Sequence, residues 1–163
     1  MAETYEKLLT FSLGSEGYGV SILKVKEIIG MMDITPVPRT PEFIKGILNL
    51  RGKIIPIMDL RIKFGMATQE YNERTCIIVA EVAIKGVQKL LGVVVDMVSE
   101  VVTISDEQIE PPPEYGTNLD HNSILGIGKI KDRVIIILDI DQVFVCEEVI
   151  KMMDKMKEGN HVQ

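Results

Sequence analysis

Two stretches of this sequence resemble one another, GVSILKVKEII at residues 19–29 and GVVVDMVSEVV at residues 92–102. Aligned without gaps, they share a Gly-Val start, an internal valine and a glutamate, and each ends on two branched aliphatic residues. A second pair follows in the same order, IIPIMDL at residues 54–60 and VIIILDI at residues 134–140. In each half of the chain, a segment that contains proline lies between the first motif and the second. Two matches in one order predict a duplicated structural unit.

Each unit is predicted to be built from strands. Apolar runs at residues 8–13 and 76–82 come first, and each leads through a glycine turn into a second strand that contains the repeated motif. A further strand then meets a basic turn, which is followed by a very apolar strand that ends at aspartate. Composition agrees, because the 163 residues include 23 Ile and 17 Val but only 4 Ala. Branched residues favour strands over helices.

The architecture expected from the residues is two small β-barrels or curled sheets that pack side by side. We expect one domain over residues 5–148, with halves at about 5–66 and 67–141 that can exchange strands. Neither half is large enough to be stable easily alone, so a shared interface is expected. A C-terminal helix is predicted over residues 142–158, and residues 159–163 are expected to be disordered.

Short helical turns are predicted at three further places. The segments Pro41–Gly46 and Asp59–Phe64 each have room for one turn, and Gly65 suits the C-terminus of the second. Ser105 and Gln108 have the spacing of a capping box.

Composition and charge exclude several classes of protein. With 46% hydrophobic residues and a net charge of −6, the chain is too apolar for a disordered protein and too acidic for a general nucleic-acid binder. No apolar run approaches the roughly 18–20 residues that span a bilayer. The start, MAETYEKLLTF, lacks the basic and apolar regions of a secretory signal. Cys76 and Cys146 are expected to be free thiols in a reducing cytoplasm, with a disulfide as the alternative.

Residues that carry catalysis or bind metal are not grouped in the sequence. His121 lies in a polar loop and His161 near the end, and neither has a cysteine at the spacing of zinc ligands. Asp139 and Asp141 resemble a metal-binding pair, but we expect them to end a strand and cap a helix. Lys129 is followed by isoleucine, whereas a P-loop needs Ser or Thr there. We therefore predict no catalytic residue, no metal site and no cofactor.

Binding by a surface has better support. In a regular strand Val25 and Glu27 share a face, so an outward Glu27 predicts an exposed valine beside a carboxylate. A bulge near Lys24 is the alternative, and it would return Val25 to the core. Arg51, in the NLRG turn, is either a solubilising turn residue or an exposed guanidinium ready for a bidentate carboxylate contact.

At these residues the chain resembles the CheW family of bacterial chemotaxis coupling proteins and, more broadly, the CheW-like domains of chemotaxis histidine kinases. The similar segments are FSLGSEGYGVSILKVKEII (11–29), DITPVPRTPEFIKGILNLRGKIIPIMDLRIKF (33–64), GVVVDMVSEV (92–101) and ILGIGKIKDRVIIILDI (124–140). Together they span nearly the whole chain in family order. The resemblance implies an all-β fold of two SH3-like five-stranded β-barrels side by side, with short helical turns and a C-terminal helix.

The resemblance also implies a function without catalysis. The expected role is a cytoplasmic adaptor that couples the cytoplasmic tip of methyl-accepting chemoreceptors to the regulatory domain of the histidine kinase CheA. It implies no nucleic-acid partner, and recruitment to the membrane only through receptor arrays. A CheW-like scaffold of a non-chemotactic kinase pathway is the alternative, and an enzyme is the weaker one because no acid/base or phosphate-binding constellation is present.

The family's receptor-binding positions carry over to particular residues of this sequence. The polar motif positions are Val25, Glu27 and Arg51, and the apolar positions are Leu9, Ile22, Ile28 and Val98. The apolar set implies that a helical hairpin of the receptor lies in a groove between the barrels. Kinase-contact residues stay unassigned, with the surroundings of Gly46–Gly52 and loops of the second barrel as candidates only.

Overall fold

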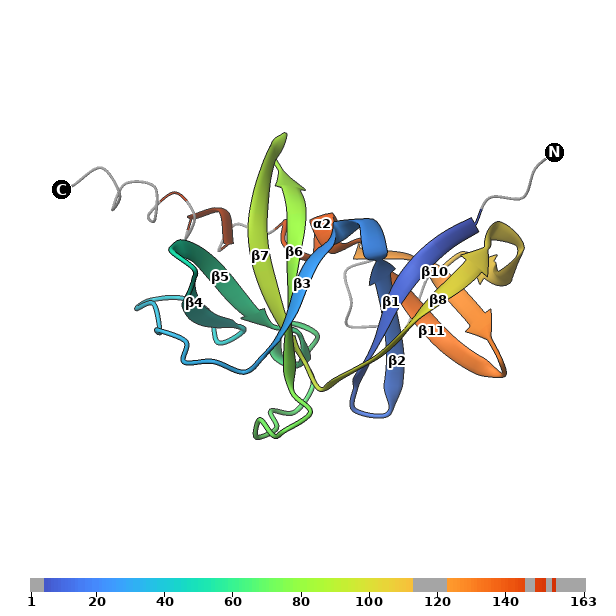
Figure 1. The fold of residues 1–163 in the computed structure, drawn as a ribbon, viewed down its shortest axis with the longest axis horizontal. Helices are drawn as coiled ribbons and strands as arrows, with labels where there is room; N and C mark the ends of the chain where they lie inside the picture. Colours follow the sequence, from blue (N-terminus) through green and yellow to red (C-terminus); the bar gives the residue numbers. More distant parts are fainter. Residues whose placement is uncertain (1–4, 113–122, 146–148, 152–153, 155–163) are drawn as a thin grey trace.

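The computed structural model describes residues 5–112, 123–145, 149–151 and 154. Within them the strands form two sheets that lie side by side (Figure 1). The six-stranded sheet contains, in spatial order, β8 (Met97–Ser105), β1 (Tyr5–Leu13), β2 (Glu16–Ser21), β11 (Arg133–Leu138), β10 (Ile124–Ile130) and β9 (Ile109–Glu110). The five-stranded sheet contains β3 (Val25–Gly30), β6 (Cys76–Ile84), β7 (Val87–Val95), β5 (Lys53–Asp59) and β4 (Ile44–Leu50). The predicted all-β fold of two small SH3-like barrels is confirmed, with the two-residue β9 as a sixth strand in one of them.

The sheets do not follow the division expected near residues 66 and 67. The six-stranded sheet takes β1 and β2 from the start of the chain and β8 to β11 from its later part, whereas the five-stranded sheet takes everything between them. The chain therefore changes sheet twice, once at the short 3-10 helix η1 (Ile22–Lys24) and once at Asp96. The exchange of strands that we expected is thus extensive.

Each repeated motif lies across one of these two crossings, which corrects one prediction. We expected residues 19–29 to form a single strand, but the structure divides them between β2 and β3. The Ser21 hydroxyl accepts a hydrogen bond from the Leu23 N–H and begins the η1 turn between the two strands. One extended strand could not serve both sheets, because the two sheets run in different directions (Figure 1).

The duplication is visible in the strand pairing. The order β8-β1-β2-β11-β10 in one sheet corresponds to β3-β6-β7-β5-β4 in the other. Each sheet has one parallel pair at its centre, β2 with β11 and β5 with β7, and Gly19 and Gly92 occupy matching places in these pairs. The hairpins β4–β5 and β10–β11 carry register shifts at matching places as well.

A shared hydrophobic core joins the two sheets. It draws buried side chains from strands of both, including Phe11 and Tyr18 of the six-stranded sheet and Ile78 and Leu91 of the five-stranded sheet. Its aromatic centre is a stack in which the Tyr18 ring lies 5.8 Å from Phe11 and 5.9 Å from Phe64, between ring centroids. Each sheet also has a smaller cluster of its own. The largest cluster of buried apolar side chains is therefore shared by the two barrels.

Two of the three predicted short helical turns are present in the structure. Helix α1 (Leu60–Lys63) is capped by the Asp59 carboxylate, and η2 (Asp106–Gln108) begins with the predicted capping box. The turn expected at residues 41–46 is instead a non-helical turn, closed by a 3.0 Å hydrogen bond from Ile44 N to the Pro41 carbonyl, after which β4 begins. Among the described residues, no helix is long and apolar enough to cross a membrane.

The C-terminal helix differs from the prediction over residues 142–158. Helix α2 covers only Ile140–Val143, Phe144 and Val145 lie outside it, and helical conformation returns at residues 149–151. The interruption has a packing reason, because Phe144 is only 1% exposed and lies in the shared core, while Val145 points away and is 46% exposed. Residues 159–163, with His161, and the positions of His121 and Cys146 lie outside the described residues.

Candidate functional site

Arg51 is presented by a tight hairpin turn between β4 and β5. Arg51 and Gly52 have φ values of +51° and +88°, as expected for the two central residues of a two-residue hairpin whose twist suits the flanking strands. The Asn49 side chain accepts a 3.0 Å hydrogen bond from the Gly52 N–H and holds the turn. The guanidinium is 71% exposed at this rigid tip.

The structure brings Arg51, in the β4–β5 turn, together with Glu27 on β3. The Nη1 and Nη2 atoms of Arg51 lie 3.0 Å and 2.5 Å from the two carboxylate oxygens of Glu27, which is a bidentate ion pair. Strands β3 and β4 are the two edges of the five-stranded sheet. The pair therefore links the edge strand β3 to the turn that follows the other edge strand, β4. The bidentate contact proposed for Arg51 is made within the chain.

The ion pair changes the ionisation of both groups. Hydrogen bonds from the Arg51 guanidinium hold the pKa of the Glu27 carboxyl below its ordinary value, against a smaller opposing effect of burial. The same hydrogen bonds raise the pKa of Arg51. At neutral pH both groups are charged, so the pair is a fixed, paired charge at the surface rather than a proton donor or acceptor.

An NMR titration of the Glu27 carboxyl carbon tests this pair. In the wild-type protein the midpoint is expected below that of an ordinary glutamate, and Arg51→Met is expected to raise it toward the ordinary value. Because the folded-state pKa is lowered, the contribution of the pair to stability is present at neutral pH and is lost as the pH falls through that lowered pKa. A midpoint that is unchanged by Arg51→Met would contradict the bidentate contact.

Beside this pair lies an open depression of about 680 Å³, which we call the barrel mouth. Its apolar wall consists of Leu50, Ile55, Val79 and Leu90. Its charged and polar rim consists of Lys26, Glu27, Arg51, Lys53, Glu81, Gln88 and Lys89. The rim has four basic and two acidic side chains, and both acidic ones are already paired, to Arg51 and to Lys26. The barrel mouth therefore suits an apolar side chain that is carried beside an acidic one.

The corresponding end of the six-stranded sheet is nearly filled. Its cavity measures about 20 Å³ and is lined partly by Thr10, Glu100 and Lys131. Thr10 is 3% exposed, and its hydroxyl donates a 2.7 Å hydrogen bond to the Glu100 carbonyl and accepts one from the Glu100 N–H. The repeat therefore yields one open mouth and one closed end, so the two barrels are not interchangeable as binding surfaces.

Val25 does not share the surface of Glu27. The register of β3 against β6 shifts between them, with Val25 opposite Ala80 and Glu27 opposite Val79. The extra residue is a bulge, which turns Val25 inward, where it packs against the shared core. Val25 is half-buried, so the expected exposed valine is wrong, and the alternative of a bulge near Lys24 is confirmed, with the extra residue at Lys26.

The four apolar positions fall into different environments. Leu9 is 3% exposed and belongs to the shared core, and Ile22 and Val98 are partly buried against the same core. Ile28 is 42% exposed on β3. In this conformation Leu9 can support the surface from beneath but does not face solvent, whereas Ile28 can contact a partner directly.

Val101 was not among the predicted contact residues, although the internal repeat aligns it with Ile28, which was. It lies on β8 and is 49% exposed. Leu23, at the crossing between the sheets, is 87% exposed, and no periodicity argument points to it. Within the described part of the chain, no group of three or more metal-ligating side chains is present.

Most of the chain is similar to known proteins. The family model described as the CheW-like domain matches residues 7–148. A chemotaxis protein CheW of Klebsiella aerogenes is 43% identical over 143 residues, which cover 88% of this chain and 84% of that protein. A chemotaxis protein CheW of Rhizobium meliloti is 35% identical over 142 residues, which cover 87% and 89%. The crystal structure of the scaffolding protein TtCheW from Thermoanaerobacter tengcongensis aligns with a TM-score of 0.80 at 40% identity, over 89% of this chain and 96% of that one.

Proposed function

Because this chain belongs to the CheW-like domain family, we propose that it is a non-catalytic adaptor that joins two specific partners in chemotaxis signalling. One partner is the cytoplasmic tip of a methyl-accepting chemoreceptor, and the other is the regulatory domain of the histidine kinase CheA. The adaptor works in the cytoplasm and reaches the membrane through receptor arrays. The names of its relatives, a chemotaxis protein and a scaffolding protein, support this role.

The proposed receptor contact is supported mainly by one observation, the exposed Arg51 guanidinium beside the barrel mouth. Glu27 uses one N–H on each of Nη1 and Nη2, and a guanidinium has five N–H donors in all. Arg51 can therefore bind a carboxylate of the receptor while it keeps Glu27. The apolar contact beside Arg51 is supplied by the wall of the barrel mouth, where Leu50 and Leu90 lie, whereas the exposed Ile28 follows Glu27 on β3 and points to the opposite face of that strand. A charged group beside an apolar surface is a common basis for recognising an amphipathic helix.

The proposed kinase contact is supported by membership of the CheW-like domain family and by the difference between the two barrel ends, of which one is open and the other nearly filled. A connector needs two different surfaces, so that one partner does not displace the other. We propose that the kinase regulatory domain binds away from Arg51, with loops of the six-stranded sheet as the candidates for its contacts.

Isothermal titration with each purified partner tests the proposal. We expect saturable binding of the wild-type protein to the kinase regulatory domain and to a receptor tip fragment. Arg51→Ala is expected to weaken receptor binding by about tenfold or more, because a charge-assisted contact is lost. Kinase binding is expected to stay unchanged.

Lys129→Ala is the matched control for the receptor arm, because Lys129 is also an exposed cation in an ion pair, to Glu110 at 2.8 Å on the other sheet. It is expected to bind the receptor tip like the wild type. Absence of heat and saturation with folded kinase domain would refute the adaptor role. If Arg51→Ala loses the folded state, measured by circular dichroism, the residue is structural and the receptor assignment fails.

A further inference from the structure

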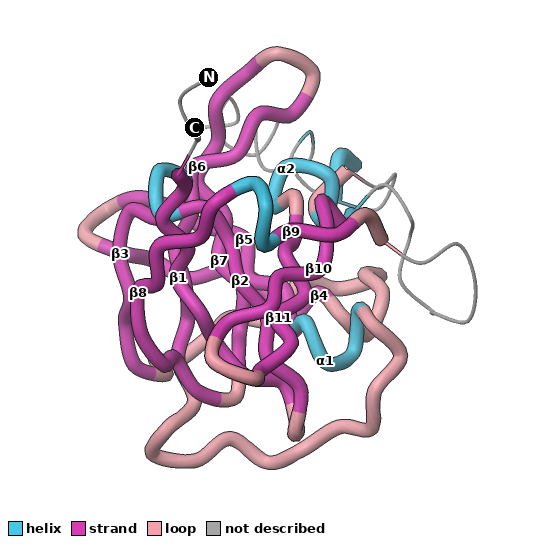
Figure 2. The backbone as a smooth tube through the Cα atoms, turned by 90° about the vertical axis from the view of Figure 1, so that its right-hand side faces the viewer, coloured by secondary structure: helices cyan, strands magenta, loops and turns pink. Residues whose placement is uncertain are grey.

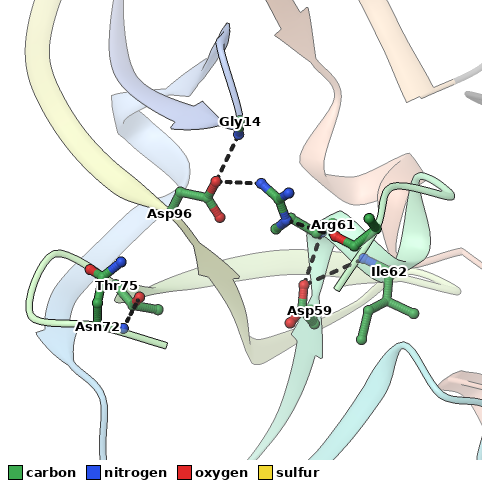
Figure 3. Close-up of polar contacts among 8 residues, drawn as sticks. Gly14, Asp59, Arg61, Ile62, Asn72, Thr75 and Asp96 are labelled. Atoms are coloured by element: carbon green, nitrogen blue, oxygen red, sulfur yellow. Dashed lines mark hydrogen bonds and ion pairs between the residues drawn. The ribbon is translucent and has the colours of Figure 1, made fainter. Parts of the chain in front are cut away.

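A charged contact ties the two sheets together at one end of their interface. Arg61 in α1 extends its side chain toward Asp96, and the Nη1 to Oδ2 distance is 2.5 Å (Figure 3). The same Asp96 oxygen accepts a 2.7 Å hydrogen bond from the backbone N–H of Gly14. Because α1 follows β5 of the five-stranded sheet and Gly14 lies in the β1–β2 turn of the six-stranded sheet, this contact spans both.

A second charged contact ties the sheets together elsewhere. Asp141 in α2 binds the Lys24 Nζ at 2.9 Å through one oxygen and accepts a 3.0 Å hydrogen bond from the Ala83 N–H through the other. Helix α2 follows β11 of the six-stranded sheet, while Ala83 belongs to β6 of the five-stranded sheet. The two helices lie apart, with α2 toward the top and α1 toward the bottom of the molecule (Figure 2).

The two contacts use equivalent helix positions of the internal repeat, with partners that lie one position apart in the alignment of residues 19–29 with residues 92–102. Arg61 is two residues after the capping aspartate of α1, and Asp141 is two residues after the capping aspartate of α2. Their partners, Asp96 and Lys24, lie at the two places where the chain changes sheet. In each contact a carboxylate also accepts a backbone N–H from the other sheet, from Gly14 of the β1–β2 turn in the first and from Ala83 of β6 in the second. The charges are reversed, with the cation on the helix in one contact and on the crossing in the other.

We propose that these two ion pairs, Arg61–Asp96 and Lys24–Asp141, are positioning residues that set the angle between the two barrels. The inference rests on the proposed function for its consequence, which is that the angle places the receptor-binding and kinase-binding surfaces at the separation that coupling needs. Neither pair touches the barrel mouth, so the effect on a partner is indirect.

The shared core and the ion pairs differ in how far they fix one orientation between the barrels. Apolar contact is not directional, so a layer of branched side chains holds two barrels together without specifying one rotation between them. Charge-assisted hydrogen bonds are directional. The side chains are mostly shielded, with exposed fractions of 15% and 23% for Arg61 and Asp96 and of 34% and 24% for Lys24 and Asp141. Two such contacts, well separated along the interface, fix a rotation that one alone would not.

Distance measurement between spin labels tests the proposal without any partner. In a background with Cys76→Ser and Cys146→Ser, labels are attached at Val87→Cys and Val134→Cys. These positions are 51% and 55% exposed and belong to different sheets. Double electron–electron resonance then reports the distribution of distances between the barrels.

Two neutral double variants remove the ion pairs without leaving an unpaired charge. They are Arg61→Met with Asp96→Asn, and Lys24→Met with Asp141→Asn, in which the amide oxygen can still accept the backbone N–H. Each is expected to broaden or shift the distance distribution, and the combination of both to do so most. Ternary coupling of receptor tip and kinase domain is expected to weaken by about 2- to 30-fold, with binding to the isolated receptor tip unchanged.

Two further variants separate positioning from general stability. Arg61→Lys keeps the charge facing Asp96 and is expected to retain the wild-type distribution. Lys129→Met with Glu110→Gln removes an ion pair inside the six-stranded sheet and is expected to retain it as well. The proposal is overturned if the combined variant stays folded with the wild-type distribution, or if Lys129→Met with Glu110→Gln broadens it equally. Failure of the wild-type protein to bind either partner would refute the proposed function but leave the distance result standing.

Discussion

Replacing Gly46 with alanine is expected to lower the free energy of unfolding by about 3 kcal/mol or more. Gly46 has a φ of +141°, which is strained for any residue with a Cβ. A Cβ added there would lie 2.0 Å from the carbonyl oxygen of Thr35. That carbonyl is held in place, because Thr35 and Ile47 exchange two backbone hydrogen bonds of 2.9 Å. Alanine must therefore break this bridge or displace β4, and urea denaturation measures the loss.

Gly30→Ala is the matched control for this prediction. Gly30 is also a strand glycine of the five-stranded sheet, but no atom lies within 4 Å of its added Cβ, so a change within about 0.5 kcal/mol is expected. Gly126→Ala tests the equivalent place in the other sheet, where the added Cβ would lie 2.8 Å from the Glu110 carbonyl oxygen. A loss below about 1 kcal/mol for Gly46→Ala would contradict the close approach of Thr35 to β4.

The repeat was enough to predict the strands and the duplication, but not the exchange between sheets. Residues 19–29 carry the same branched aliphatic pattern before and after η1, and a single turn of 3-10 helix leaves almost no mark in such a pattern. Which sheet a strand joins depends on pairing with segments far away in the chain, such as β2 with β11 and β3 with β6. Local periodicity does not contain that information.

The candidate site shows the same division between local and long-range information. The polar residues Glu27 and Arg51 were identified from their motifs, but their contact arises because the fold brings the β4–β5 turn beside β3, which is 24 residues away in the sequence. The inward turn of Val25 depends on a bulge, which adds one residue without any change of composition. The break of the C-terminal helix at Phe144 likewise depends on space in the shared core, which no stripe of apolar residues predicts.

The shared core explains why a duplicated chain did not become two independent domains. Each barrel contains a small hydrophobic cluster of its own, but the aromatic stack lies between the barrels. Phe11 and Tyr18 come from the six-stranded sheet, and Phe64 follows helix α1, after β5 of the five-stranded sheet. A small barrel without this layer would expose much of its apolar surface and be marginal at best. The two barrels are therefore expected to fold and unfold together as one unit.

Phe11→Ala is expected to destabilise both barrels together, by about 3–5 kcal/mol, because it leaves a cavity in the shared core. Phe11 is 1% exposed and stacks on Tyr18. Although Phe11 belongs to the six-stranded sheet, amide hydrogen exchange is expected to accelerate equally at Leu91 in the five-stranded sheet, in a single unfolding transition. Leu125→Ala, at a 54% exposed position, is the control and is expected to change stability by no more than about 0.5 kcal/mol. Two separate transitions, with Leu91 protected as in the wild type, would mean that each barrel is stable alone and that the ion pairs, rather than the core, hold the barrels together.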